Sequence, residues 1–502
     1  MPKYYVTTPI YYVNDVPHIG HAYTTVAADA IARYHRLVGD DVFFLTGTDE
    51  HGINIQRIAE QRGLSPLEHA DDVAGRFKEL WQQLDVSYSR FVRTTEVGHH
   101  RAALALWDRI LAAGDVYRDV YTGYYCPRCE AYYQLDELVE GRCPVHMLAC
   151  EREEEENYFF RLSSYQEPLE RLVRDTDFVQ PEIRRNEVLG ILRQGLRDFS
   201  VTRRNVRWGI PVPQAPGEVL YVWVDALSNY LTGVGFPDDR ATFDRYWPAD
   251  VHLVGKEIIR FHCLYWPALL MSAGLPVPRH VFAHGWLTKD GQKISKTTGN
   301  IIDPGALAEE FGPDAFRYFF LREIPFGQDG DYSRAAFLHR YNGDLANDLG
   351  NLVHRTVALV DRFGGGFVPT PGEPEGPDRE LRDLAQSLPE TIQNAMEALA
   401  LHDAIAGAFG LVARANRYVE ETAPWELARA GDQRRIDTVL YHLAEAVRLA
   451  AWHLHPFLPR ASAEIYGRLG AGDLAPNQAQ FGLLRPGSAV APGPPLFPRW
   501  EG

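Results

Sequence analysis

Lysine is scarce in this chain but gathers in one short loop. Of the 51 basic residues only 6 are lysine, and three of those six, Lys289, Lys293 and Lys296, lie between residues 289 and 296. An ammonium group is a compact charge on a flexible stem, so it can follow a phosphate that moves, whereas a guanidinium prefers a fixed planar partner. Gly291 and Gly299 allow the loop to hinge. The pattern fits either a mobile phosphate contact or a solvated basic turn.

A second group with chemical potential opens the first predicted helix. His18 and His21 flank Gly20, and imidazoles three residues apart share one face of a helix. The free N–H groups and the dipole at a helix start favour an anion. A glycine there lets an adenine ring lie against the backbone. Two histidines around a glycine are weak evidence alone, but at a helix start just after a strand they indicate a nucleotide site.

A third group has the spacing of metal ligands. Cys126 and Cys129 are followed after 13 residues by Cys143 and His146. This spacing predicts a tetrahedral Zn²⁺ site with one zinc ion per chain, and a site whose four ligands all come from protein is structural. Free thiols are the alternative reading, and Cys150 lies close enough to compete as a ligand.

The elements that must position these groups alternate between strand and helix. Residues 3–12 are predicted to form a buried strand, and residues 41–46 a second strand. Between them, Pro17 stands where a first helical residue is expected, and the helical pattern runs over 18–37. The polar residues 47–52 follow that strand, where parallel sheets bind ligands, so Asp49 is a candidate partner for an ammonium group or else a helix cap. This is the usual beginning of a nucleotide-binding α/β fold.

The same pattern returns later in the chain. Residues 219–224 read as another buried strand, with a helix from Asp225, and further strands are predicted at 250–254 and 281–283. The stretch between the two halves therefore looks like an insertion.

The predicted fold class is a Rossmann-like α/β catalytic domain with an inserted zinc-knuckle module, followed by an α-helical bundle. The predicted boundaries are 1–115 and 218–288 for the two halves of the catalytic domain, 116–217 for the insertion, 289–342 for the lysine loop and a connector, 343–470 for the bundle, and 471–502 for a tail packed on the surface.

One face of the bundle's first helix carries amide and guanidinium groups. Asn347, Asn351 and Arg355 recur every four residues, and Trp425 could serve as a stacking platform. Such groups suit the base edges of a single-stranded RNA loop. On periodicity alone, an ordinary polar helix face with a buried tryptophan is the preferred explanation.

Composition sets broad limits. The net charge of −16 argues against a general nucleic-acid binder but allows RNA contacts through local arginine patches. Apolar content of 45% fits large buried cores, and no apolar run is long enough to cross a bilayer. With no signal or transit peptide recognisable at the N-terminus, a cytoplasmic location without membrane contact is expected.

The order of these motifs resembles the class I aminoacyl-tRNA synthetases, and among them most closely the methionyl-tRNA synthetase family. The resemblance extends over nearly the whole chain. It rests on residues 8–14 (TPIYYVN), 18–21 (HIGH), 47–52 (GTDEHG), 221–227 (YVWVDAL), 255–258 (GKEI), 293–297 (KISKT), 349–352 (LGNL) and 424–425 (PW). The family usually has Met at Ile294 and often Asp at Glu257, and both changes are conservative.

The resemblance implies ATP-dependent activation of L-methionine to methionyl-adenylate, with release of pyrophosphate, and transfer of methionine to the 3′ end of tRNA(Met), including the initiator. Mg²⁺ arrives with ATP. His18, His21, Lys293 and Lys296 are implied in catalysis, and Gly20, His284 and Ser295 join them around ATP. Asp49 is implied to pair with the substrate ammonium.

The implied methionine pocket is formed by Ile10, Tyr12, Trp223, Ala226, Leu227, Tyr230, Ile258, Phe261 and His262. Its aromatic, apolar character suits a flexible thioether. In this family the bundle reads the CAU anticodon, at positions that match Asn347, Asn351, Arg355 and Trp425.

Three other readings stay open. Synthetases for isoleucine, valine or leucine typically carry a larger insertion with an editing site, and one for cysteine would place zinc in the amino-acid pocket. A regulator that binds tRNA without chemistry would not need the histidine pair and the lysine loop. A nucleotidylyltransferase acting without RNA would leave the bundle without a task. The chain as given is expected to be a monomer. The sequence leaves open its oligomeric state in the natural context, a further C-terminal domain, the rejection of homocysteine, and the roles of Lys289 and Cys150.

Overall fold

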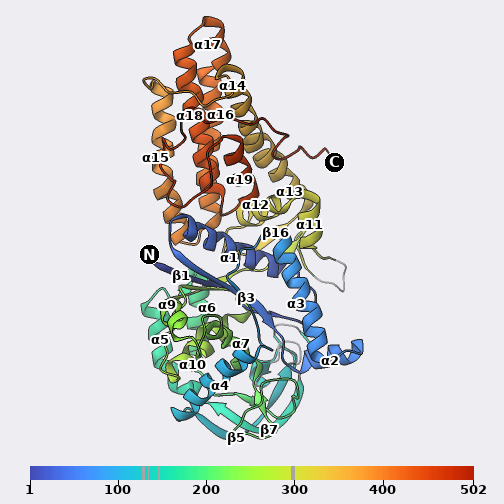
Figure 1. The fold of residues 1–502 in the computed structure, drawn as a ribbon. Coiled ribbons are helices and arrows are strands. Elements are labelled where there is room, and N and C mark those ends of the chain that lie inside the picture. The colour runs from blue at the N-terminus through green and yellow to red at the C-terminus, as the bar shows by residue number, and fades with distance from the viewer. Residues whose placement is uncertain (127–130, 134, 145–146, 295–299, 502) are drawn as a thin grey trace.

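The computed structural model describes residues 1–126, 131–133, 135–144, 147–294 and 300–501. Of the residues singled out above, Cys129, His146, Ser295, Lys296 and Gly299 lie outside these ranges. Within them the chain forms a lower α/β part and an upper helical part, joined around helix α1 (Figure 1).

A parallel sheet is the frame of the lower part. Its strands are β1 (Lys3–Thr7), β2 (Tyr11–Tyr12), β3 (Asp41–Asp49), β4 (Arg90–Arg93), β8 (Val179–Gln180), β12 (Val251–Gly255) and β13 (His280–His284). The order is β2-β3-β1-β12-β13-β8, with β4 also paired to β3, and each of these pairings is parallel. In such a sheet, ligands bind beyond the carboxyl ends of the strands.

Helices cover both faces of the sheet, and successive residues of β1 face opposite cores. Val6 belongs to a core shared with α1 and the bundle, whereas Tyr5 belongs to a core shared with α4 and α10. The helices of this part are α1 (Ile19–Leu37), α2 (Ile53–Arg62), α3 (Pro66–Gln83), α4 (Val97–Ala112), α7 (Val222–Leu227), α8 (Asn229–Gly233), α9 (Arg240–Tyr246) and α10 (Trp266–Ser272).

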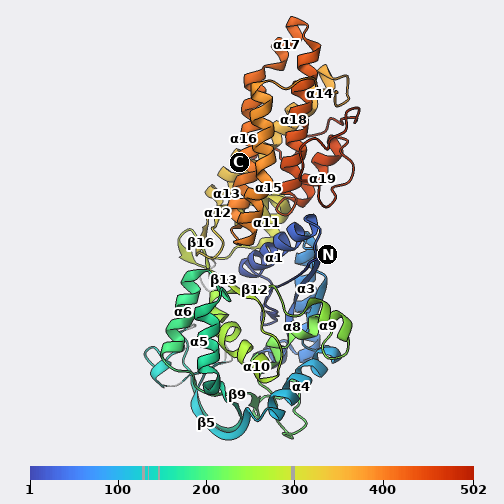
Figure 2. The ribbon, with the colours of Figure 1, turned by 90° about the vertical axis from the view of Figure 1, so that its left-hand side faces the viewer.

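The segment predicted as an insertion forms a second, antiparallel sheet at the foot of the molecule (Figure 2). Its strands are β5 (Val116–Cys126), β6 (Ala131–Tyr133), β7 (Glu151–Phe160) and β9 (Phe199–Ser200), in the order β6-β5-β7-β9. The same segment contains α5 (Gln166–Asp175), α6 (Glu182–Arg193) and β10 (Thr202–Arg203), which pairs with β11 (Val219–Leu220). It also supplies β8 to the main sheet, so it is not a separate body.

A connector leads from the main sheet to the bundle. It contains the hairpin β14 (Leu287–Lys289) and β15 (Gln292–Lys293), then α11 (Pro304–Phe311), α12 (Pro313–Glu323), β16 (Gly330–Tyr332), α13 (Arg334–Arg340) and the π-helical stretch η5 (Tyr341–Gly350). Strand β14 pairs with both β15 and β16 in a small sheet.

The upper part is a helical bundle, with α17 at its tip (Figure 1). Its helices are α14 (Asn351–Phe363), α15 (Gly376–Glu397), α16 (Leu401–Thr422), α17 (Pro424–Ala430), α18 (Gln433–Leu454) and α19 (Pro459–Arg468). Beyond α19 the chain runs back along the bundle and the connector. Leu484 and Phe497 of this tail are buried, and the Asn477 N–H donates to the Leu37 carbonyl of α1 at 2.8 Å.

Three predicted elements differ from the observed ones. The strand expected at 219–224 ends at Leu220, and helix α7 begins at Val222. A short apolar run suits a buried helix as well as a buried strand, and here every side chain of α7 except Trp223 is buried. Pro17 precedes the helix, because His18 is the N-cap. The strand expected over 3–12 is interrupted between Thr7 and Tyr11.

Within the described ranges, none of the helices is long and apolar enough to cross a membrane.

Candidate active site

The start of α1 carries the two histidines in a reciprocal cap. The Gly20 N–H donates to His18 Nδ1 at 3.1 Å, and the His18 N–H donates to His21 Nδ1 at 3.3 Å. The two rings stack with centroids 3.6 Å apart. A Cβ on Gly20 would lie 3.0 Å from His18 Cε1, so the glycine makes room for the ring. The cap thus places both imidazoles at the positive end of the helix, where anions bind.

Thr24 joins this helix start to the end of strand β13. Its hydroxyl lies 2.7 Å from His284 Nε2 and donates to the Gly20 carbonyl at 3.0 Å. The rings of Tyr23 and His284 also meet edge to face, with centroids 5.2 Å apart. The predicted ATP residues His18, Gly20, His21 and His284 are therefore brought together, whereas Thr24 had no signal in the sequence beyond its place one turn after Gly20.

The lysine hairpin leaves β13 directly and folds back toward it. Lys293 on β15 pairs with Thr288 on β14, only four residues after His284. Lys289 is at the other end of the hairpin, where its ammonium donates to the Ile301 carbonyl at 3.0 Å. Lys293 thus lies opposite the segment that follows the carboxyl end of β13, and Lys289 bonds the backbone where the chain returns at Ile301. Ser295 and Lys296 belong to the part that is not described.

Aromatic side chains of the predicted methionine pocket lie in two pairs. Trp223 and Phe261 stack with centroids 3.6 Å apart and an interplanar angle of 4°. The Tyr230 hydroxyl lies 2.7 Å from His262 Nε2, and His262 Nδ1 lies 3.0 Å from the Ile258 carbonyl.

The protonation of His262 follows from these contacts. Because a carbonyl only accepts, His262 Nδ1 carries the proton, so Nε2 accepts the hydrogen bond from Tyr230. Burial lowers the pKa of His262 to about 4, which keeps the ring neutral at pH 7.

The remaining apolar candidates belong to the same side of the sheet. Leu227 and Tyr230 are buried in the core on that face, and Ile10, Trp223, Ile258 and Phe261 pack against it. Ala226 is also buried. Tyr12 packs against the opposite core but is the register partner of Asp49 on β3.

His252 was missed by sequence reasoning. It stacks on Tyr230 with centroids 4.0 Å apart and hydrogen-bonds Thr7 Oγ1 at 2.8 Å. A histidine inside an apolar strand gives little sign in the sequence that it will stack on a candidate pocket residue.

Asp49 is the last residue of β3, and its neighbour Glu50 is held rigidly. Helix α2 is capped by Gly52, so Asp49 is not a helix cap. The buried Glu50 carboxylate accepts hydrogen bonds from Thr48 Oγ1 at 2.6 Å and from Arg93 Nε at 2.6 Å. A carboxylate at a strand end beside a fixed neighbour is well placed to receive an ammonium group.

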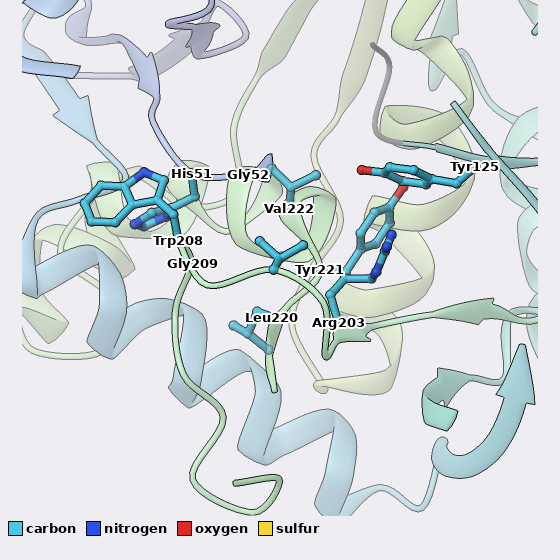
Figure 3. A pocket seen from close by; sticks show the side chains of 10 residues that line it. His51, Gly52, Tyr125, Arg203, Trp208, Gly209, Leu220, Tyr221 and Val222 are labelled. Atoms are coloured by element: carbon cyan, nitrogen blue, oxygen red, sulfur yellow. The ribbon is translucent and has the colours of Figure 1, made fainter. Parts of the chain in front are cut away.

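A buried Asp–His cluster braces the loop after Asp49. Asp225 Oδ2 lies 2.7 Å from His51 Nδ1, and Asp225 Oδ1 lies 2.7 Å from His99 Nε2. Burial alone would raise the pKa of Asp225, but His51 and His99 outweigh it and hold that pKa well below its ordinary value. His51 and Trp208 line a small cavity with Tyr125 of β5 and Arg203 of β10 (Figure 3).

The described cysteines of the predicted metal site lie near one another. Cys126 and Cys143 are buried together with Tyr133, and Cys150 packs against them. Burial, and then the neighbouring thiols of Cys126 and Cys143, raise the pKa of Cys150 to about 11. In the described part of the chain, no group of three or more side chains is arranged to hold a metal ion, and Cys129 and His146 are outside it.

The predicted RNA-reading residues are found where η5 passes into α14 and at the start of α17. Asn347 and Asn351 are exposed, and Arg355 is partly buried. An Arg355 guanidinium nitrogen lies 2.6 Å from Glu420 Oε1 on α16, five residues before Trp425. Trp425 packs its ring partly against the bundle core. Arg355 is therefore tied to the end of α16 that leads into α17 and Trp425.

Comparison with known proteins gives a consistent result. The family model described as tRNA synthetases class I (M) matches residues 4–154 and 145–357, and the model described as anticodon binding domain of methionyl tRNA ligase matches residues 368–500. The methionine–tRNA ligase of Caldanaerobacter subterraneus subsp. tengcongensis is 48% identical over 501 residues, which cover 99% of this chain and 78% of that protein. That of Thermosynechococcus vestitus is 46% identical and covers 99% and 97%.

Solved structures agree. Mycobacterium tuberculosis methionyl-tRNA synthetase in complex with methionyl-adenylate superimposes with a TM-score of 0.95 at 46% identity, over 99% of this chain and 100% of that chain. The apo form of the same enzyme gives a TM-score of 0.89 at 44% identity, over 100% and 99%.

Proposed function

This chain belongs to the methionyl-tRNA synthetase family of class I aminoacyl-tRNA synthetases, and from that premise we propose that it is a methionine–tRNA ligase. In the first step the methionine carboxylate attacks the α-phosphorus of ATP, and the bond to the bridging oxygen breaks to release pyrophosphate. In the second step a ribose hydroxyl at the 3′ end of tRNA attacks the methionyl carbonyl and AMP leaves. Such reactions depend on positioning and charge stabilisation without a protein nucleophile.

One arrangement carries this proposal. The capped histidine pair of α1 is joined through Thr24 to His284 at the end of β13. Phe261 and His262, one member of each aromatic pair, follow the end of the neighbouring strand β12. This arrangement supports a phosphate site beside an apolar site, at the carboxyl ends of β12 and β13. His18 and His21 bind the ATP phosphates in this proposal, with Gly20, His284 and Ser295 around the nucleotide, and Lys293 and Lys296 meet the charge that develops on pyrophosphate. Mg²⁺ enters with ATP.

The apolar site is proposed to select methionine. Trp223 and Phe261 supply aromatic faces, and Tyr230 and His262 supply neutral polar edges toward the thioether. Asp49 pairs with the ammonium group of the amino acid. The walls are completed by Ile10, Tyr12, Ala226, Leu227 and Ile258.

Amino-acid-dependent ATP–pyrophosphate exchange tests the proposal. Exchange is expected with methionine and not with isoleucine, valine, leucine or cysteine. Exchange with one of those amino acids but not with methionine would overturn the proposed specificity. Exchange with methionine but no binding of tRNA would favour a small-molecule enzyme instead.

The bundle is proposed to read the CAU anticodon through Asn347, Asn351, Arg355 and Trp425. We expect Arg355→Ala to weaken tRNA charging, because a planar donor for a base edge is lost, with a fall in kcat/KM for tRNA of roughly 10- to 200-fold. Adenylate formation should be unchanged, because Arg355 is far along the chain from the catalytic elements. Aminoacylation and pyrophosphate exchange are measured side by side.

The matched control is Arg429→Ala, which removes an exposed arginine of α17 that is paired to Glu426 within its own helix. Its effect on charging should be small. An Arg355→Ala enzyme that loses exchange as strongly as charging would argue against a role in anticodon reading.

A structural Zn²⁺ at Cys126, Cys129, Cys143 and His146 is also proposed. Its support is the ligand spacing, together with the burial of Cys126 and Cys143 beside a third thiol. Thiolates and imidazole are the ligands that Zn²⁺ prefers, and bound zinc would stabilise the inserted sheet. Elemental analysis should find one zinc per chain, lowered in Cys126→Ser.

Three further features stay proposals. We propose that the chain divides at residues 115, 217, 288, 342 and 470, that it acts in the cytoplasm, and that it is a monomer. Sedimentation at several concentrations tests the last of these.

A further inference from the structure

The hairpin that carries Lys293 is attached to the connector by more than strand pairing. Its turn, Asp290-Gly291, has both residues at positive φ, 53° and 71°, as a two-residue type I′ hairpin requires. Strand β16 lies parallel to β14, with Thr288 opposite Asp331. The Asp290 N–H also donates to the Tyr332 carbonyl at 2.9 Å.

Asp331 bonds both sides of the hairpin. One carboxylate oxygen, Oδ1, accepts a hydrogen bond from Thr288 Oγ1 at 2.6 Å and another from the Gly291 N–H at 2.8 Å. Asp331 is exposed, so water could satisfy the same groups without it. The Asp331 side chain is therefore no part of the buried core. Its two hydrogen bonds help to hold the hairpin in one direction relative to β16.

The far foot of the lysine loop is tied to the same place. The Asn300 side-chain amide donates to the Lys289 carbonyl at 3.2 Å and to the Lys293 carbonyl at 3.3 Å. Lys289 donates to the Ile301 carbonyl at 3.0 Å, which gives a structural task to a residue that had none. The chain therefore returns beside the hairpin from which it left. The position of the hairpin thus sets the position of both ends of the lysine loop.

The segment before β16 holds the base of the hairpin against the main sheet. Asp329 Oδ1 accepts from the Trp286 N–H at 2.8 Å and from the Lys256 ammonium at 2.7 Å. A Cβ on Gly285 would lie 2.4 Å from the Asp329 backbone nitrogen, so this approach requires glycine. The base is thus held on both sides, and beyond it the orientation of the hairpin is set by the pairing of β14 with β16, by the Asp290–Tyr332 bond and by the contacts of Asp331.

We propose that Asp331 is a positioning residue for methionine activation, which orients the hairpin so that Lys293 meets the leaving pyrophosphate. The proposal rests on the proposed function of Lys293. In this proposal Asp331 acts through the hairpin and makes no contact with methionine or ATP. Its loss should therefore lower the rate of activation, which depends on placement within a fraction of an ångström, and leave the binding of methionine unchanged.

The test compares Asp331→Ala, Asp331→Asn and Thr288→Val in methionine-dependent pyrophosphate exchange. We expect Asp331→Ala to lower kcat about tenfold with KM for methionine unchanged, as the loss of two hydrogen bonds in an exposed site would give. Asp331→Asn keeps an oxygen acceptor at Oδ1 and should retain most of the rate. Thr288→Val removes one of the two bonds and should cost about threefold.

A double-mutant cycle separates the specific contact from general damage. Asp331→Ala with Thr288→Val should be little slower than Asp331→Ala alone, because the shared bond is already lost and Thr288 then keeps only its longer bond of 3.2 Å to the Gly330 carbonyl. In hydrogen exchange, the Gly291 amide should exchange faster in Asp331→Ala, while the amides of β13 stay protected. Asp473→Ala, an exposed aspartate of the tail, is the matched control and should behave as the wild type.

Three results would overturn the proposal: a wild-type rate in Asp331→Ala, equal losses in Asp331→Ala and Asp331→Asn, or additive losses in the double variant. If Asp331→Ala does not fold, Asp331→Asn and Thr288→Val decide, since each keeps part of the network. A wild-type protein without methionine-dependent exchange would instead refute the proposed function.

Discussion

Replacement of Lys293 by alanine is expected to lower the rate of methionyl-adenylate formation by about 10²- to 10³-fold, while methionine binding stays nearly unchanged. An ammonium group that meets charge developing on pyrophosphate is used in the transition state much more than in the ground state. Lys293 is on the exposed strand β15, opposite Thr288 and close in sequence to His284. Lys296→Ala should behave in the same way.

Single-turnover formation of the adenylate and equilibrium binding of methionine separate the two effects. Lys78→Ala is a matched control, because Lys78 is an exposed lysine of α3 whose ammonium lies over the Phe91 ring. Its activation rate should equal that of the wild type. If Lys293→Ala reduced binding and rate by the same factor, uniform binding and not transition-state stabilisation would be the role of Lys293.

Sequence reasoning worked best where the interactions are local. The cap formed by His18 and His21 joins residues only three apart, so the sequence predicts both the histidine motif and the helix start. The parallel arrangement followed from alternating strands and helices. The strand expected at 219–224 failed because six apolar residues do not distinguish a buried strand from the buried helix α7.

Residues that act through distant partners gave no usable signal. Asp225 bonds His51 and His99, which are 174 and 126 residues away in the chain. Thr24 meets His284 at a separation of 260 residues, and His252 acquires its place only by stacking on Tyr230. Their roles come from tertiary packing, which spacing and composition do not encode.

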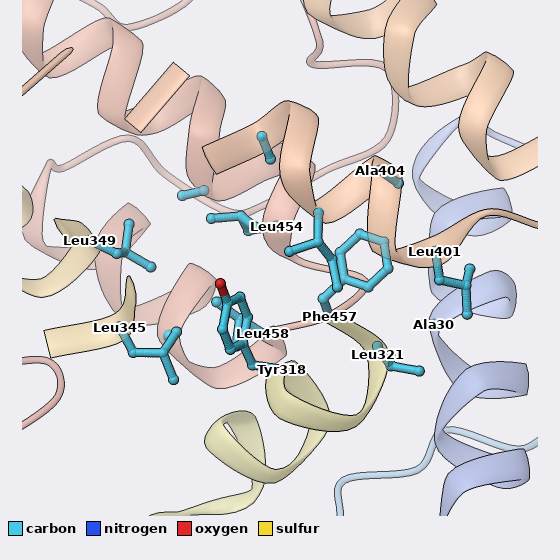
Figure 4. Close-up of a cluster of buried hydrophobic side chains, with 14 of the residues drawn as sticks. Ala30, Tyr318, Leu321, Leu345, Leu349, Leu401, Ala404, Leu454, Phe457 and Leu458 are labelled. Atoms are coloured by element: carbon cyan, nitrogen blue, oxygen red, sulfur yellow. The ribbon is translucent and has the colours of Figure 1, made fainter. Parts of the chain in front are cut away.

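The junction between the α/β part and the helical bundle is also created by tertiary packing. Apolar side chains of α1, α12, α16 and the α18–α19 turn pack there, among them Ala30, Leu321, Leu401 and Phe457 (Figure 4). Within this core Arg317 of α12 is fully buried, and one of its nitrogens lies 2.7 Å from Asp29 Oδ2 on α1. Arg317 also donates to the Pro456 carbonyl at 2.7 Å and the Phe457 carbonyl at 3.2 Å.

We expect Arg317→Met to destabilise the protein by roughly 3–5 kcal/mol, because it leaves the buried Asp29 charge with fewer partners and two buried carbonyls without a donor. Calorimetry should show a lower Tm and a division of the transition into two, one for each part of the molecule. Charging of tRNA should fall more than pyrophosphate exchange, because the bundle loses its fixed direction relative to α1.

The control for this prediction is Arg240→Met, which breaks an exposed pair with Asp244 one turn away on α9. A surface pair of this kind contributes roughly 0–1 kcal/mol, so its Tm should change little. An equal loss in the two variants would mean that the buried pair contributes no more than a surface pair. Asp29→Leu combined with Arg317→Met should recover part of the stability lost in Arg317→Met, since the unpaired charge is then absent.

The pH dependence of stability follows from the same pair. Burial alone would raise the pKa of Asp29, but Arg317 and then Arg33 and Ser87 lower it to about 2. A carboxyl with a depressed pKa stabilises the folded state above its unfolded pKa of 3.8, by about 2 kcal/mol here, and this contribution is lost as the pH falls from about 4 to about 2.

Without Arg317 the pKa of Asp29 should rise, so the stability that comes from the depressed pKa shrinks. The Tm difference between wild type and Arg317→Met should therefore be largest above pH 4 and narrow toward pH 2. A difference that stays constant over this range would show that the loss comes from packing alone and not from the Asp29 charge.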